Sequence, residues 1–120
     1  MTPIISMLAA LAERGDTRPI TLLASFRSEP DILFAAEIDA ARTRLPGLEA
    51  RIVLTAPDAA WRGERGRIAA TTLRPCVSGA TRAHLCGPPA MMQAMIAALQ
   101  ACGLRREAIR TEAFVSSLTR

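Results

Sequence analysis

The segment Cys86-Gly87-Pro88-Pro89 combines residue types that can bring another molecule close to the backbone. A strand is expected to end at Cys86, and Gly87 lets another molecule approach the main chain closely. Two prolines stiffen the turn, and Pro89 suits the first position of a helix. A helix start at the carboxyl edge of a parallel sheet favours dinucleotide binding. Taken alone, Cys86 fits a buried structural thiol equally well.

A second candidate group follows the first expected strand. Ser25, Arg27 and Ser28 stand where ligands bind in open parallel sheets, beyond the carboxyl ends of the strands. An arginine there can grip an adenosine phosphate through charge-assisted contacts. The alternative is a surface arginine paired with Glu29 or Asp31.

The third candidate is the dipeptide Thr2-Pro3, which opens the first expected helix. The start of a helix has free amide groups and a partial positive charge, which suit a phosphate or an amide oxygen. An ordinary helix cap is the alternative interpretation.

Other notable residues are better explained by packing or solvation. Met91, Met92 and Met95 are expected in a core, and His84 is expected to be packed or exposed on a strand. Glu112 and Phe114 end the last expected strand, where Phe114 either covers a ring or fills the core. The loop containing Trp61 lacks a phosphate-binding glycine pattern, and its charged residues are expected to be solvated.

Helix-like and strand-like segments alternate along the chain. The pattern predicts strands at residues 19–26, 50–55, 81–86 and 108–114, the first of them buried on both faces. Helices are predicted at residues 2–14, from 28 to about 45, at 67–74 and at 90–101. The fold class is therefore α/β, a doubly wound parallel sheet in one domain over residues 1–120.

The predicted order begins with a helix, although such folds begin with a central strand. We therefore expect the sheet to lack its first central strand. Two neighbouring strands would then have unpaired backbone groups.

Composition excludes several classes of protein. Half of the residues are hydrophobic, aromatic residues make up 3%, and all fifteen basic residues are scattered arginines. No nucleic-acid partner is expected. Cys76, Cys86 and Cys102 lack disulfide or zinc spacing, so no metal is expected and a reducing, cytoplasmic location is predicted. No apolar run has transmembrane length.

The ordered set of segments resembles the NAD(P)H-binding domain of the ferredoxin–NADP⁺ reductase superfamily, in its oxygenase-reductase and ferric-reductase-like branch. The matching residues cover nearly the whole chain, and the Cys-Gly-Pro-Pro stretch with Met91 and Met92 is the most specific. They are Thr2-Pro3 with residues 4–8, Arg27, residues 31–34 with Glu37 and Ile38, Trp61, Gly63, Gly66, Ile68, residues 86–92, Glu112 and Phe114.

The resemblance implies hydride transfer from NAD(P)H to an FAD held by a flavin-binding barrel domain. Electrons would then pass to a ferredoxin, a haem, an iron–sulfur centre or a ferric chelate. Cys86 and Glu112 would serve at the reacting centre. The cofactor-binding residues would be Thr2, Pro3, Ser25, Arg27, Cys86, Gly87, Pro88, Met91 and Phe114.

The chain contains neither the family's first strand with its glycine-rich turn nor the flavin barrel. Alone it is therefore expected not to complete hydride transfer to flavin. A ferric-reductase-like parent would place it at the cytoplasmic face of a membrane. Arg27 leans towards NADPH, whereas Glu29 keeps NADH open.

Two further hypotheses remain. One is a non-catalytic remnant or interaction domain that self-associates or pairs through its open sheet. The other is a receiver-type domain, which ranks last because Asp16, Asp31 and Asp58 do not form the acidic cluster it needs.

Overall fold

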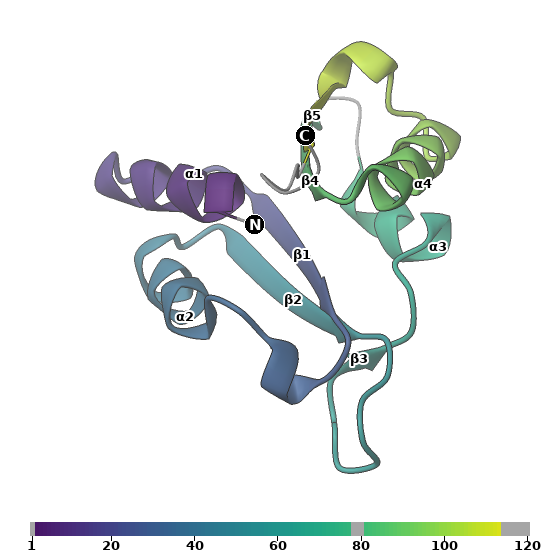
Figure 1. Ribbon diagram of the computed structural model, residues 1–120. Coiled ribbons are helices and arrows are strands. Elements are labelled where there is room, and N and C mark those ends of the chain that lie inside the picture. Colours follow the sequence, from purple (N-terminus) through teal and green to yellow (C-terminus); the bar gives the residue numbers. More distant parts are fainter. Residues whose placement is uncertain (1, 78–80, 114–120) are drawn as a thin grey trace, which may run out of the picture. The chain divides into compact units, whose positions relative to one another are not determined.

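The computed structural model describes residues 2–77 and 81–113 (Figure 1). The chain divides into two compact units. We call residues Ile5–Arg67 the N-terminal unit, and Met1–Ile4 with Ile68–Arg120 the C-terminal unit. Each unit holds its own parallel sheet.

The N-terminal unit contains a three-stranded parallel sheet in the order β1-β2-β3. Its strands are β1 (Ile20–Phe26), β2 (Leu48–Leu54) and the short β3 (Glu64–Arg65), which the sequence pattern missed. Ile20 pairs with Leu48 and Phe26 with Leu54, so β1 and β2 run in register over their full length. Helix α1 (Thr2–Glu13) begins in the C-terminal unit and continues into this one. Helix α2 (Ala35–Arg44) connects β1 to β2.

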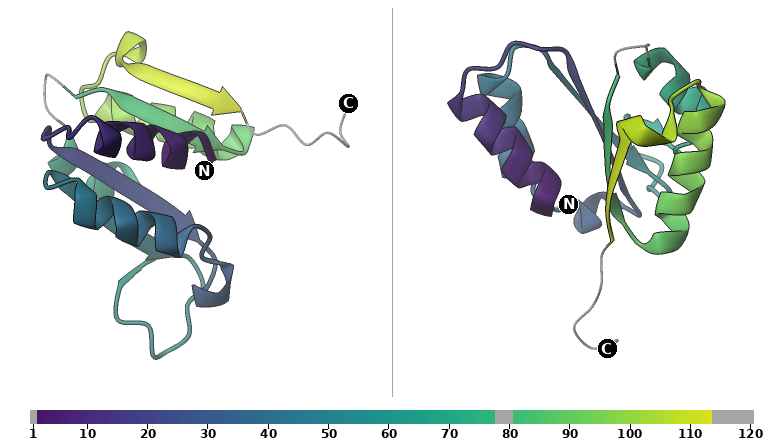
Figure 2. Two further views of the ribbon diagram at one scale, coloured as in Figure 1. Left: turned by 90° about the vertical axis from the view of Figure 1, so that its left-hand side faces the viewer. Right: turned by 90° about the horizontal axis from the view of Figure 1, so that it is seen from above.

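The C-terminal unit contains the parallel pair β4 (Ala83–Gly87) and β5 (Ile109–Ala113). Helix α4 (Pro89–Ala101) connects β4 to β5 along the chain and packs on both strands (Figure 2). The short α3 (Ala70–Leu73) packs on α4 and continues into a 3-10 turn, η2 (Arg74–Cys76). A second such turn, η3 (Arg106–Ala108), leads into β5. The predicted parallel α/β pattern is confirmed in both units.

The predicted start of the second helix is wrong. Ser28 does cap a turn, with the Asp31 carboxylate accepting from the Ser28 backbone amide at 3.1 Å and from its hydroxyl at 2.6 Å. That turn is only the 3-10 element η1 (Glu29–Asp31). The backbone becomes extended at Ile32 and left-handed at Phe34, so α2 begins at Ala35. Leu33, which precedes α2, is 58% exposed.

The expectation that β1 is buried on both faces is also wrong. Leu22 and Ala24 are buried, whereas Thr21 and Ser25 on the opposite face are exposed. Figure 2 shows α1 and α2 on the same side of the β1–β2 pair. The two helices therefore cover one face, and burial alternates along the strand.

The strand pairings are separate in the two sheets. Within the described residues, β1 pairs with β2 alone and β4 with β5 alone. Each therefore has one edge without a strand partner in this part of the chain.

Candidate functional site

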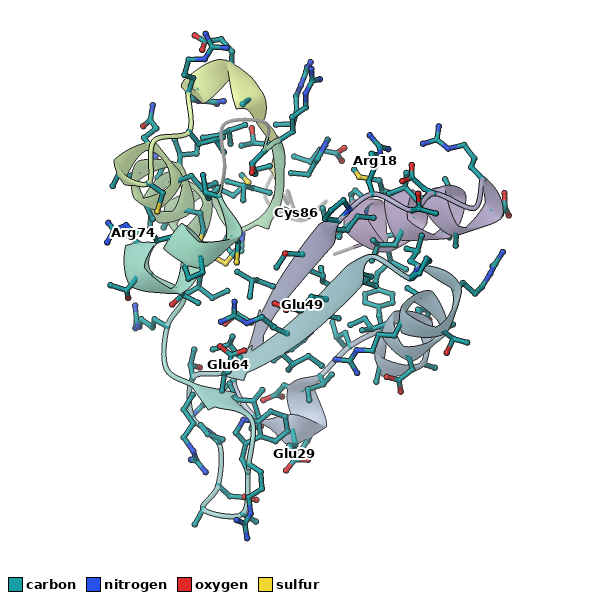
Figure 3. All side chains as sticks on the ribbon, turned by 180° about the vertical axis from the view of Figure 1, so that it is seen from behind. Arg18, Glu29, Glu49, Glu64, Arg74 and Cys86 are labelled. Atoms are coloured by element: carbon teal, nitrogen blue, oxygen red, sulfur yellow. The ribbon has the colours of Figure 1, made fainter. Side chains whose placement is uncertain are left out.

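Cys86 and Glu112 are neighbours across the β4–β5 pair. The two residues are in register near the carboxyl ends of parallel strands, which lie about 4.8 Å apart in the hydrogen-bonding direction. Register partners present their side chains to the same face of a sheet. Cys86, labelled in Figure 3, is half-buried, and Glu112 is exposed. A thiol and a carboxylate therefore share one face at the edge where ligands bind in parallel sheets.

The turn after Cys86 is as the sequence predicted. Gly87 ends β4, Pro88 caps α4 with extended backbone angles, and Pro89 is the first helical residue. The amide of Met92 already donates to the Pro88 carbonyl at 3.0 Å. Prolines have no amide hydrogen. In the first turn of α4, the amides that come before this bond are therefore those of Ala90 and Met91.

Met91 does not lie in the core, contrary to the expectation for all three methionines. It is 40% exposed, and its terminal methyl covers the Cα of Gly87 so closely that a Cβ there would overlap it. Met92 is buried and Met95 is half-buried. Met91 is therefore a residue of the site rather than of the core.

Thr2 and Pro3 belong to the same unit as Cys86 and Gly87. Helix α1 starts at Thr2 itself, so the capping position falls on Met1, outside the described residues. Thr2 is exposed and Pro3 half-buried. The backbone there fits the predicted helix start, although Thr2 is a first-turn residue and not the cap.

Ser25 and Arg27 lie in the N-terminal unit, at the carboxyl end of β1, and both are exposed. The Arg27 carbonyl accepts from the Ala56 amide at 2.8 Å, which fixes the backbone on the β2 side. Within the described residues, no ion pair joins Arg27 to Glu29 or Asp31. The guanidinium is thus available for an anion.

The loop after β2 is more ordered than its composition suggested. The Trp61 indole donates to the Glu64 carbonyl at 2.9 Å and packs against Gly63. Arg51 holds the Glu64 carboxylate with two contacts, Nε–Oε2 at 2.8 Å and Nη2–Oε1 at 2.6 Å. These hydrogen bonds, followed by the charge of Arg51, lower the pKa of Glu64. The signal in the sequence is Gly63, which leaves room for the indole.

Other predicted residues are accounted for as follows. His84 is exposed and in register with Arg110 on β5. Cys102 ends α4, and its thiol donates to the Ala70 carbonyl at 3.4 Å. Phe114 lies outside the described residues.

The model of the oxidoreductase NAD-binding domain family matches residues 1–96. The chain belongs to this family. The match includes the Cys-Gly-Pro-Pro turn and the carboxyl end of β1 and ends before Glu112.

Similar proteins include reductases and a flavohemoglobin. The chain is 31% identical, over 98% of its length and 36% of the relative, to the ferredoxin–NAD(P)⁺ reductase component of naphthalene 1,2-dioxygenase/salicylate 5-hydroxylase systems from Ralstonia sp. Flavohemoglobin from Malassezia yamatoensis, solved with bound FAD and heme, shares 26% identity at a TM-score of 0.84, covering 95% of this chain and 29% of that one. The cytochrome b5 reductase domain of Ulva prolifera nitrate reductase shares the fold, with 24% identity, a TM-score of 0.82 and 92% and 44% coverage.

The chain thus spans about a third of the length of its curated relatives. In the C-terminal unit, Gly87 ends β4 beside the flexible side chain of Met91. In the N-terminal unit, Arg27 presents an exposed cation just after β1. Each of these residue types suits one part of a nicotinamide dinucleotide. No described helix has the length and apolar character needed to cross a bilayer.

Proposed function

We propose that this chain is the NAD(P)H-binding module of a flavin-dependent reductase, acting over residues 1–120. The observation that carries the proposal is the Cys86–Glu112 register pair beside the Gly87 turn, within a chain of the oxidoreductase NAD-binding domain family. NAD(P)H would supply a hydride to FAD held by a barrel domain, and electrons would continue to a ferredoxin, haem, iron–sulfur or ferric acceptor.

Each group of residues has a distinct part in this proposal. The Gly87-Pro88 turn offers an uncharged surface to the nicotinamide ring, and Cys86 and Glu112 border it. Thr2 and Pro3 bring the start of α1 to the pyrophosphate. Ser25 and Arg27 bind the adenosine ribose and its phosphate, for which the exposed guanidinium is suited. The protein's contribution is orientation and exclusion of water, while the cofactors supply the redox chemistry.

The proposal includes a location and a partner. Cysteine spacing without a disulfide pattern favours the cytoplasm or the cytoplasmic face of a membrane. The similarity to a ferredoxin–NAD(P)⁺ reductase component favours an iron–sulfur acceptor. In the proposal, Phe114 covers the nicotinamide ring near the flavin.

A titration of the ¹⁵N-labelled chain with NADH, NADPH and 5′-AMP tests the proposal. Both dinucleotides should shift the amide signals of Thr2, Arg27 and Gly87. In contrast, 5′-AMP should shift Arg27 and leave Gly87 in place. A folded sample that shows no response at millimolar dinucleotide contradicts the proposal.

A second candidate function is supported by the strand pairing. Within the described residues, β1 and β4 each have a single neighbouring strand, so an added strand could pair at either edge. A non-catalytic interaction domain, or a chain that self-associates through these edges, would use that capacity. It would bind no nicotinamide nucleotide, and so the titration separates the two functions.

A further inference from the structure

The contact between Met91 and Gly87 follows from local geometry. Met91 is the third residue of α4, and side chains of a helix point towards its N-terminus. The thioether therefore reaches back over the turn to Gly87, four residues earlier. Its sulfur lies 3.3 Å from the position that a Cβ of residue 87 would take, and its terminal methyl lies closer still. Only glycine leaves room for this packing.

Met91 lies outside the core, with 40% of its surface exposed. It is one of the two large apolar side chains exposed among the described residues, the other being Leu33. Methionine has three rotatable side-chain bonds and adopts several shapes at low cost. The neighbouring Met92, in contrast, is buried with 7% exposure. Met91 can therefore change rotamer without disturbing the core.

We infer that Met91 is a movable cover on the Gly87 backbone, and that it turns aside when an aromatic ring binds there. The inference rests on the proposed function, in which the ring is nicotinamide. After turning, the thioether is placed to contact the ring edge, a favourable position for sulfur beside an aromatic system. Met91 is thus a positioning residue that sets how the ring meets Gly87.

The experiment follows the Met91 methyl group by NMR in the full chain labelled with [ε-¹³C]methionine. Without nucleotide, a nuclear Overhauser effect should connect the Met91 methyl to the Gly87 α-protons. Saturation with NADH should remove that effect and shift the methyl signal, whereas 5′-AMP should do neither. The buried Met92 methyl is the internal control and should keep its position.

Two variants sharpen the test. Gly87→Ala should drive the Met91 methyl away without nucleotide, because the new Cβ takes its place. It should weaken NADH binding about tenfold and leave 5′-AMP binding unchanged, as a methyl forced into a packed contact would do. Gly87→Ala with Met91→Ala removes the overlap and should fold like the wild type while keeping weak NADH binding.

The outcomes distinguish the two proposals. If NADH binds and the Overhauser effect between Met91 and Gly87 persists at saturation, the cover is refuted and the proposed function stands. If NADH does not bind the folded wild-type chain, the proposed function fails, and the cover fails with it.

Discussion

Two residues of the same type show how local contacts decide what an arginine can do. Arg51 is committed to Glu64 by a two-contact ion pair. Arg27 is exposed and has no carboxylate partner within the described residues. A partner-free guanidinium at the carboxyl end of a strand is the one expected to meet a phosphate.

Replacing Arg27 by Ala should weaken NADPH binding about tenfold, since a charge-assisted hydrogen bond contributes roughly 1.5–3 kcal/mol. NADH should lose less than about threefold, because it has no 2′-phosphate. The N-terminal unit has nine arginines and nine acidic residues, so its net charge is close to zero. A loss of NADPH affinity therefore reports a local contact of Arg27 rather than the net charge of the unit. Isothermal titration with both nucleotides measures this. Arg62→Ala is the matched exposed control, and equal losses for the two nucleotides would contradict the role of Arg27.

Asp16 offers a pH-dependent prediction at the residue scale. The Arg18 side chain donates to its carboxylate at 2.8–3.1 Å and the Arg18 amide at 2.9 Å. These bonds, with the charges of Arg18 and Arg14, lower the pKa of Asp16 from 3.8 to about 2. A lowered pKa in the folded state means that the ionised form stabilises the fold above about pH 4. This contribution is lost as the pH falls from 4 to 2.

Carboxyl ¹³C NMR should therefore give an Asp16 titration midpoint near 2. In Arg18→Ala the midpoint should return towards 3.8, because the largest cause of the shift is removed. A wild-type midpoint near 4 would show that the Asp16–Arg18 contact does not persist in solution.

At the scale of elements, helix ends are fixed by glycines where left-handed backbone is required. After α4, Gly103 has φ +98°, and the Leu104 amide donates to the Leu99 carbonyl at 3.0 Å. This bond satisfies a carbonyl of the last turn and leads the chain towards η3 and β5. This turn therefore sets the direction in which the chain leaves α4 on its way to β5, which pairs with β4.

Gly103→Ala should lower the free energy of unfolding by about 1–2 kcal/mol, the cost of a left-handed backbone for a residue with a Cβ. No atom outside the turn would meet that Cβ, so the effect is conformational and not steric. Urea denaturation measures it. Gly103→Asn should lose less, because asparagine tolerates this conformation, and equal losses for both variants would contradict the explanation.

At the scale of the whole molecule, the two sheets place their candidate residues at carboxyl strand ends. Cys86, Gly87 and Glu112 lie in the C-terminal unit, and Ser25 and Arg27 in the N-terminal unit. In the proposal, the C-terminal unit binds the nicotinamide and the N-terminal unit binds the adenosine. Cofactor fragments should therefore report on the units separately, as the 5′-AMP titration is designed to show.

Strand edges lead to the prediction for the whole chain. Because β1 and β4 each pair with one strand in the described part of the chain, backbone groups along their other edges could pair with a second copy. Size-exclusion chromatography with light scattering should show mass above 12.8 kDa that rises with concentration. Leu23→Lys, on the partly exposed face of β1, should reduce this association. A wild-type monomer at all concentrations would exclude self-pairing through these edges.

Periodicity and turn residues alone determined most elements. The apolar spacing predicted α1, α4 and four of the strands, and glycines with positive φ angles, Gly15 and Gly103, follow the ends of α1 and α4. The Cys-Gly-Pro-Pro turn was predicted in detail, because proline and glycine restrict the backbone whatever surrounds them. These features depend on contacts between near neighbours, which a sequence displays directly.

Tertiary structure decided the features that depend on distant partners. The exposure of one face of β1 and the strand β3 arise from packing and pairing across the unit. The register that sets Cys86 beside Glu112 joins residues on two separate strands. Met91 was expected in the core because helical spacing predicts only which face of a helix is apolar on average. Its place over Gly87 depends on the turn before the helix, where the missing Cβ leaves the space it fills.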